Sequence, residues 1–274
     1  MAVELEINDG PAAEWWLSPD IWTVPGDDPE GPAALPRPGE PFYVWARVRN
    51  RTRAAVQDAR VRFYWADPSA GFTRASLEQL GQVVGTAAVS FTEGQASQEV
   101  LCLTPVSLPA GHSCLLAEAY HPWLDPLPTM AKFNVPTDRH VAQRNISVVM
   151  TRDGTFRMTF DVHNSERLPR SFTLAAEPGS VDSLKTGWDK LFILPAELRD
   201  GAVRDLGLSL MACPDAADRP APKMEGVKLA AGTRRRLSVT GRLDGQMGVA
   251  HIRTYCDGAV IGGLSVLILQ KEVL

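Results

Sequence analysis

The sequence predicts an all-β protein made of two tandem immunoglobulin-like Greek-key β-sandwiches, and three observations lead to this prediction. The 274 residues suit two domains of about 100–150 residues each. The 22 glycines and 21 prolines are spread along the chain and mark frequent turns. Between them lie short segments of alternating apolar and polar residues, without the crossover helices that a parallel sheet requires. We place the domains at residues 1–141 and 142–274.

The N-terminal segment is rich in proline, glycine and acidic residues but carries a dense apolar cluster. Trp15, Trp16 and Trp22 present too much apolar surface to remain in water. We therefore expect an edge strand at about residues 20–24 that closes the first sandwich. Five prolines between residues 25 and 39 predict a loop, because proline has no N–H group to donate to a sheet.

The rest of the first domain reads as short strands. Residues 42–50 alternate regularly between apolar and polar side chains, and residues 60–65 repeat the pattern. Further strands are expected at about residues 83–91, 97–103 and 113–121. The proline- and glycine-containing segment between the last two predicts a hairpin connection.

The pattern then restarts in the second domain. Residues 145–150 and 155–164 predict a hairpin around Asp153-Gly154. Asp257-Gly258 is a second tight-turn signal, between the two last strands of the chain. The remaining expected strands cover about residues 171–176, 206–212, 236–240, 249–256 and 260–269.

Several segments of the first domain resemble the bacterial cell-adhesion-related domain, an immunoglobulin-like module. These segments are Ser-Pro-Asp-Ile-Trp at residues 18–22, Arg-Val-Arg-Asn at 47–50, Val-Arg-Phe-Tyr-Trp-Ala-Asp-Pro at 61–68, Gly-His-Ser-Cys-Leu-Leu-Ala at 111–117 and Asp-Arg-His-Val-Ala-Gln-Arg-Asn at 138–145. The resemblance covers about residues 15–150 and implies an immunoglobulin-like sandwich. Modules of this type serve as adhesion, spacer or accessory domains, so the resemblance implies a role in contacts and no particular ligand.

Charge and hydropathy exclude several settings. The formal net charge of −4 gives no reason to expect a nucleic-acid partner. The start of the chain is acidic and lacks the basic and apolar regions of a signal peptide. The longest apolar run, residues 260–269, contains two glycines and predicts a buried strand instead of a membrane span. We expect a cytoplasmic location, with export by a route that needs no cleaved signal left open.

No pattern of catalytic or metal-binding residues is visible, so we expect a non-enzymatic protein without a cofactor. The phosphate-binding glycine motifs, the nucleophile elbow and the zinc-protease motif are absent. The histidines are not paired at metal-ligand spacing. Cys102 and Cys114 flank a turn and are either buried thiols or a disulfide. Asp27, Asp28 and Glu30 form either a solvated acidic loop or the minimum of a calcium site.

One surface of the first domain stands out. If the strands at residues 42–50 and 60–65 pair, arginines and aromatic residues share one sheet face, a mixture enriched at protein interfaces. We take this face as the hypothetical binding site. Its residues are Tyr43, Trp45, Arg47, Arg49, Arg60, Arg62 and Tyr64.

The expected partner is a protein or a second copy of the chain, and the expected function is a structural or interaction protein. Arginines stacked over aromatic rings on a solvated face would look the same in sequence. A sulfated or phosphorylated polymer is another candidate ligand, because guanidinium groups match such anions. A carbohydrate-binding module would use Tyr43, Trp45 and Tyr64 as stacking platforms. A hydrolase whose residues meet only in the fold is the remaining alternative.

Overall fold

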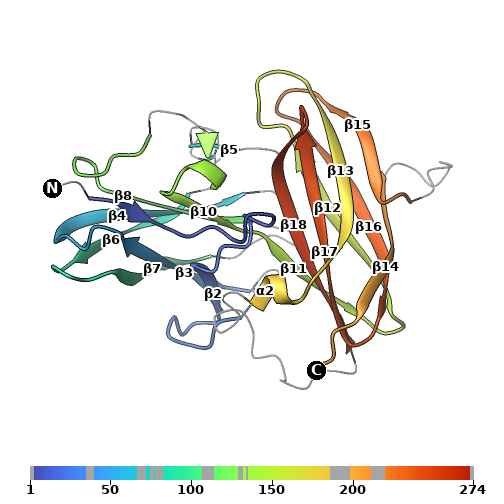
Figure 1. The fold of residues 1–274 in the computed structure, drawn as a ribbon, viewed down its shortest axis with the longest axis horizontal. Coiled ribbons are helices and arrows are strands. Elements are labelled where there is room, and N and C mark those ends of the chain that lie inside the picture. Colours follow the sequence, from blue (N-terminus) through green and yellow to red (C-terminus); the bar gives the residue numbers. More distant parts are fainter. Residues whose placement is uncertain are drawn as a thin grey trace. The chain divides into compact units, whose positions relative to one another are not determined.

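The structure is a computed structural model, and it is nearly all β (Figure 1). It describes residues 3–34, 40–66, 72–74, 77, 83–106, 114–128, 132–133, 135–185, 198–210 and 220–271. The chain divides into two compact units; of the described residues, those up to Arg144 belong to unit 1 and those from Asn145 onward to unit 2. The predicted all-β class is confirmed.

Unit 1 is a sandwich of two sheets. In the first sheet, β3 (Phe42–Asn50) pairs with β1 (Leu5–Glu6), β2 (Ile21–Pro25) and β7 (Ser97–Val106). In the second, the order is β10 (Val141–Arg144), β8 (Cys114–Tyr120), β4 (Val56–Ala66) and β6 (Val83–Phe91). The chain changes sheet from β3 to β4, from β6 to β7 and from β7 to β8, as in immunoglobulin-like Greek-key sandwiches.

The two sheets of unit 1 enclose one apolar core. Every second residue of β3, from Phe42 to Val48, is buried in it, and Val61 and Phe63 of β4 approach from the other sheet. The predicted edge strand is confirmed as β2, and the three tryptophans of the N-terminal cluster are buried. A two-stranded sheet of β5 (Phe72–Thr73) and β9 (Lys132–Phe133) and the 3-10 helix η1 (Val135–Thr137) complete the unit.

Unit 2 has the same two-layer plan. One sheet contains, in order, β11 (Ile146–Thr151), β18 (Ala259–Gln270), β17 (Met247–Cys256), β13 (Arg170–Gly179) and β15 (Lys223–Leu229). The other contains β12 (Thr155–His163), β16 (Arg234–Asp244) and β14 (Ala202–Leu210). The short helix α2 (Asp182–Lys185) follows β13. In the described part of the chain, no helix is long and apolar enough to cross a membrane.

Two predicted hairpins are wrong. β11 pairs with β18 and β12 with β16, so the turn at Gly154 passes the chain from one sheet to the other. In the same way β7 and β8 belong to different sheets. The physical reason is that each of these strands turns its apolar residues toward a shared core from opposite sides. The Asp257-Gly258 hairpin between β17 and β18 is confirmed, with φ values of 51° and 80°.

Two sequence interpretations change as a consequence. Cys102 and Cys114 lie on strands of different sheets, and both are free thiols. β10 pairs with β8, so residues 142–144 extend the first sandwich instead of opening the second. Cys213 lies outside the described residues.

Candidate functional site

The predicted arginine and aromatic face does not form as one surface. β3 and β4 lie in different sheets, so Tyr43, Trp45, Arg47 and Arg49 are separated from Arg60, Arg62 and Tyr64. Both strands place their apolar residues in the same core, and their polar faces therefore point apart. Each half of the predicted site has to be considered by itself.

On the β3 side, the predicted residues are engaged within the chain. Trp45 stacks on Trp22 at a ring distance of 6.0 Å, and its indole N–H donates to the Pro29 carbonyl at 3.0 Å. Arg49 donates two hydrogen bonds, of 2.8 and 2.9 Å, to the fully buried carboxylate of Asp20. This bidentate pair anchors β3 to the segment before β2. One face of the Trp45 ring is therefore covered by Trp22.

Arg47 is engaged in a similar way. Its guanidinium group lies over the Trp22 ring at 5.9 Å and donates to the Glu99 carboxylate at 2.9 Å. These contacts match the interpretation of arginines that shield aromatic rings on a sheet face. The contacts of Trp45, Arg47 and Arg49 on β3 therefore stabilise the surface of the first sandwich.

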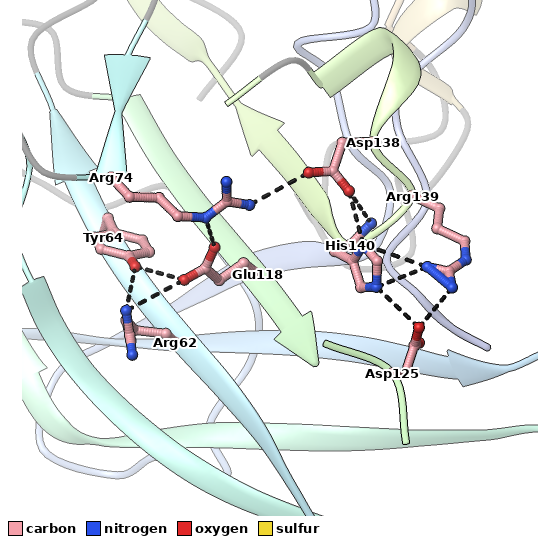
Figure 2. Close-up of polar contacts among 8 residues, drawn as sticks. All are labelled: Arg62, Tyr64, Arg74, Glu118, Asp125, Asp138, Arg139 and His140. Carbon is pink, nitrogen blue, oxygen red and sulfur yellow. Dashed lines mark hydrogen bonds and ion pairs between the residues drawn. The ribbon is translucent and has the colours of Figure 1, made fainter. Parts of the chain in front are cut away.

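On the β4 side, a buried carboxylate collects the predicted residues. Glu118 of β8 is fully buried and accepts hydrogen bonds from the Tyr64 hydroxyl at 2.6 Å and from Arg74 Nε at 2.7 Å (Figure 2). Arg62 lies 3.5 Å from the same carboxylate and donates to the Tyr120 hydroxyl at 2.9 Å. Burial, followed by the charge of Glu118, raises the pKa of Tyr64. Because Tyr64 is fully buried, it cannot be a sugar-stacking platform, and that assignment is wrong.

The polar contacts continue from Glu118 toward the end of β8. Arg74 also donates to Asp138 at 3.3 Å, and Asp138 Oδ1 lies 2.8 Å from His140 Nδ1 (Figure 2). His140 Nε2 in turn lies 3.2 Å from Asp125 Oδ1. We call the eight residues of Figure 2 the polar network. They are Arg62, Tyr64, Arg74, Glu118, Asp125, Asp138, Arg139 and His140.

Opposing influences act on the central imidazole. Burial lowers the pKa of His140, and the hydrogen bonds to Asp125 and Asp138 raise it by more. The guanidinium of Arg139, 2.7 Å from Nε2, opposes the two carboxylates. The net result is a pKa of His140 above its ordinary value.

Asp125 connects this network to a closed turn. The His121 N–H donates to the Asp125 carbonyl at 3.0 Å, and the Asp125 N–H donates back to the His121 carbonyl at 3.1 Å. His121 Nδ1 accepts the backbone N–H groups of Trp123 at 3.1 Å and Leu124 at 2.9 Å. We call residues 121–125 the Trp123 turn.

The base of the Trp123 turn is fixed to the sandwich by the Asp125 side chain. Its carboxylate accepts the Leu5 backbone N–H and the Arg139 guanidinium, both at 2.6 Å. The apex, by contrast, projects into solvent: Trp123 is 86% exposed and Leu124 is 48% exposed. Among the described large hydrophobic residues, Trp123 is the most exposed. A rigid turn that presents a tryptophan has the character of an interface hot spot.

The segments that resemble the adhesion-related domain meet within unit 1. Arg144, from the segment at 138–145, donates to the backbone carbonyls of Ser18 at 2.6 Å and Ile21 at 2.7 Å. The Ser18 N–H donates to the Gln143 carbonyl at 2.9 Å. Burial lowers the pKa of Arg144 to about 9. Ser18, Gln143 and Arg144 hold the start of the edge strand β2 against β10, so we assign them a role in the stability of the fold.

The sequence left open two further kinds of site, a calcium site and a hydrolase site. In the described residues, no three acidic, histidine or cysteine side chains converge as a metal site, and the side chains of Asp27, Asp28 and Glu30 point into solvent. In unit 2, His251 Nδ1 lies 2.8 Å from Ser265 Oγ and its Nε2 lies 3.5 Å from Ser183 Oγ. The Ser183 hydroxyl donates to the Ser180 carbonyl at 2.5 Å.

Sequence reasoning missed most of the functional candidates. Arg74, Glu118, Asp125, Asp138, Arg139, Trp123 and Leu124 were not assigned. A signal for the turn existed in His-Pro-Trp-Leu-Asp-Pro at residues 121–126, where prolines bracket an apolar pair. The carboxylates had no such signal, because their partners are distant in sequence.

No family model and no curated protein matches the chain. Solved structures with some likeness include the N-terminal domain of PorA, at 14% identity over 46% of this chain and 87% of that one, with a TM-score of 0.29. The CupB6 tip adhesin from Pseudomonas aeruginosa matches at 11% identity over 99% and 98% of the two chains, with a TM-score of 0.26. PapD-like domain 7 of human CEP192 matches at 7% identity over 46% and 80%, with a TM-score of 0.22. At such TM-scores these likenesses carry no argument about function.

Proposed function

We propose that the chain is a non-enzymatic interaction protein whose first domain contacts a partner protein through the Trp123 turn. The observation that carries this proposal is the 86% exposure of Trp123 at the apex of a turn fixed at its base. Tryptophan is among the residues most enriched at interface hot spots. Because the turn is already ordered, little conformational entropy is lost when a partner covers it.

The surroundings of the turn indicate what kind of partner would fit. Arg60 is exposed and is the register partner of Tyr120, the last residue of β8 before the turn. Arg62 lies over the Tyr120 ring at 5.6 Å. Of the seven residues of the predicted face, Arg60 is the one that is exposed. A complementary partner would offer an apolar pocket for Trp123 with carboxylates beside it.

The non-enzymatic part of the proposal draws support from the contacts of His251 with Ser183 and Ser265 in unit 2. Burial, followed by the charge of Arg253, lowers the pKa of His251 to about 4, which makes it a weak base. The Ser183 hydroxyl is directed to a carbonyl oxygen instead of the imidazole. Both features favour a structural hydrogen-bond chain over an activated nucleophile.

Carbohydrate binding is the second candidate function, and the same exposed indole supports it, because tryptophan rings stack on sugars. In that case Trp123 would replace the platforms predicted at Trp45 and Tyr64. A glycan array distinguishes the two functions. Saturable sugar binding that Trp123→Ala abolishes would favour the carbohydrate-binding module.

The protein-binding proposal is tested with a matched pair of variants, Trp123→Ala and Leu168→Ala. Leu168 is 66% exposed in unit 2. Leu168→Ala therefore removes a comparable exposed apolar side chain away from the Trp123 turn. Proteins retained by the wild type are identified, purified and titrated against each variant by calorimetry. We expect Trp123→Ala to weaken binding about 30- to 1,000-fold, as for a hot spot of about 2–4 kcal/mol, and Leu168→Ala to leave it unchanged. A purified partner that binds both variants with wild-type affinity would overturn the proposal.

A further inference from the structure

The strand β6 is the outermost strand of the second sheet of unit 1 (Figure 1). One of its edges pairs antiparallel with β4, from Val56 opposite Phe91 to Tyr64 opposite Val83. No described residue hydrogen-bonds to the backbone along its other edge. The outer edge of β6 therefore presents a row of N–H and C=O groups that a further strand could pair with.

The sequence of β6 lacks the usual protection of such an edge. Its nine residues, Val-Val-Gly-Thr-Ala-Ala-Val-Ser-Phe, contain no charge and no proline. Proteins normally protect exposed edges with charges, prolines or bulges, and in β6 the one register shift lies at the start of the strand, between Val83 and Gly85. Among the described strands at the edge of a sheet, β6 is the longest without charge or proline. β7, for example, carries Glu99 and Pro105, and β15 carries Lys223, Glu225 and Lys228.

The side chains of β6 leave room for a neighbouring strand. Val89 and Phe91 are buried in the core, and Ala87 packs against it. The residues that face solvent at the centre of the strand, Thr86 and Ala88, are small. An added strand would meet no bulky or charged side chain of β6 at the centre of this face, where Arg62 and Arg60 of β4 stand opposite Thr86 and Ala88, and main-chain hydrogen bonds would supply most of the contact.

We propose that β6 is a strand-addition site through which two copies of this chain associate, β6 to β6 and antiparallel, as a closed dimer. A strand that has neither charge nor large side chains offers little with which to select a foreign sequence, and it meets no like-charge repulsion from its own copy. In a two-fold arrangement centred near Ala87, Thr86 would stand opposite Ala88 in both halves. This pairing consumes both free edges, so the assembly stops at two copies.

The dimer contact is separate from the apex of the Trp123 turn, although Arg60 and Arg62 of β4 lie opposite Ala88 and Thr86 of β6. β6 borders β4, whereas the Trp123 turn follows β8, two strands across the sheet. Loss of one contact therefore leaves the other measurable. A dimer would also carry two Trp123 turns, which would raise its apparent affinity for a multivalent partner.

The test uses the full chain and light scattering after size exclusion. The wild type is expected at twice the 29.8 kDa chain mass. The variants Thr86→Glu/Ala88→Glu and Thr86→Lys/Ala88→Lys should each elute as monomers, because like charges would face each other across the two-fold axis. An equimolar mixture of the two should recover the dimer, since the charges then attract. This recovery also shows that both variants remain folded.

The matched control places charge on the neighbouring edge strand. Gln98→Lys on β7, where Gln98 is exposed, should leave the dimer intact. Wild-type protein that stays monomeric at all concentrations overturns the proposal, as does a dimer that survives both β6 variants. Monomeric variants whose mixture stays monomeric overturn the antiparallel β6 pairing.

Discussion

The buried polar groups of the two units differ in kind. In unit 1, Glu118 and Asp125 are buried carboxylates that are each paired with arginine. In unit 2, the buried polar groups include Asn164 and Ser265, which hydrogen-bond without charge. Charged pairs order the segments that leave the sheets of unit 1, including the Trp123 turn. The neutral groups Asn164 and Ser265 hydrogen-bond within the interior of unit 2.

The two buried histidines show this difference most directly. Burial lowers the pKa of both, but in His140 the hydrogen bonds to Asp125 and Asp138 outweigh it and the pKa is raised. His251 has a serine neighbour and a nearby arginine instead, and its pKa falls to about 4. Unit 1 should therefore lose stability as the pH rises through the pKa of His140, and unit 2 should lose stability as the pH falls toward the pKa of His251.

The largest effect is expected when the central carboxylate of unit 1 loses its charge. Glu118→Gln leaves Arg62 and Arg74 beside a neutral group, and breaking such a buried pair costs about 3–5 kcal/mol of unfolding free energy. Urea unfolding is followed by tryptophan fluorescence, which reports unit 1, where the described tryptophans lie, and by far-UV circular dichroism, which reports the strands of both units. The unit 2 control is Asp161→Asn, which removes an exposed pair with Arg236 and should cost less than about 1 kcal/mol. Equal losses in the two variants would contradict the contrast between the units.

The next largest effect is a loss of unit 2 stability at low pH. A histidine whose folded-state pKa is depressed contributes stability above its unfolded pKa and loses it as the pH falls toward the folded value. Between pH 6.5 and about 4, His251 should cost unit 2 up to about 3 kcal/mol, at about 1.4 kcal/mol per pH unit. Calorimetry at a series of pH values should show this slope in the wild type and lose it in His251→Gln. A slope that persists in the variant would assign it to other groups.

The strands were more predictable than their partners. β3 and β6 have the bounds that alternation and turn signals predict, because burial of one face is written in the side chains of each strand. Alternation states which face is buried but not which strand lies beside it, and the condition that β3 and β4 pair, on which the predicted face depended, is not met. β15 was missed because its three charged residues conceal the buried pair Val227 and Leu229.

The candidate site was less predictable still. An apolar pair such as Trp123 and Leu124 reads in sequence as core, and its exposure follows only from the closed turn beneath it. That turn depends on Asp125, whose carboxylate accepts the N–H of Leu5, 120 residues away. Contacts over such separations leave no local pattern, so the predicted site contained Arg62 and Tyr64 but not the carboxylate that joins them.

A smaller difference in stability is expected between two variants that each remove the carboxylate of a turn, one in unit 1 and one in unit 2. Asp125→Ala removes the acceptor of Leu5 and Arg139 at a buried position, and we expect a loss of about 2–3 kcal/mol with faster amide exchange at Trp123 and Leu124. Asp153→Ala removes the exposed acceptor of the Thr155 N–H and hydroxyl in unit 2, and we expect a smaller loss than for Asp125→Ala. Hydrogen exchange by mass spectrometry measures both. Unchanged exchange at residues 121–125 in the first variant would show that Asp125 does not hold the turn.

The smallest effect is expected at His140, because burial and Arg139 oppose its two carboxylate neighbours. A raised folded-state pKa gives stability that is present below the unfolded value near 6.5 and is lost as the pH rises through the folded value. Asp9 titrates with the same sign, since burial, with Glu6 and Asp138, raises its pKa to about 8. The measurement therefore compares Asp9→Asn with Asp9→Asn/His140→Gln. The single variant should lose unit 1 stability above pH 6.5, and the double variant should not. Parallel pH profiles would show that His140 is neutral between Asp125 and Asp138, and that the imidazole is held there by Arg139 acting as donor to Nε2.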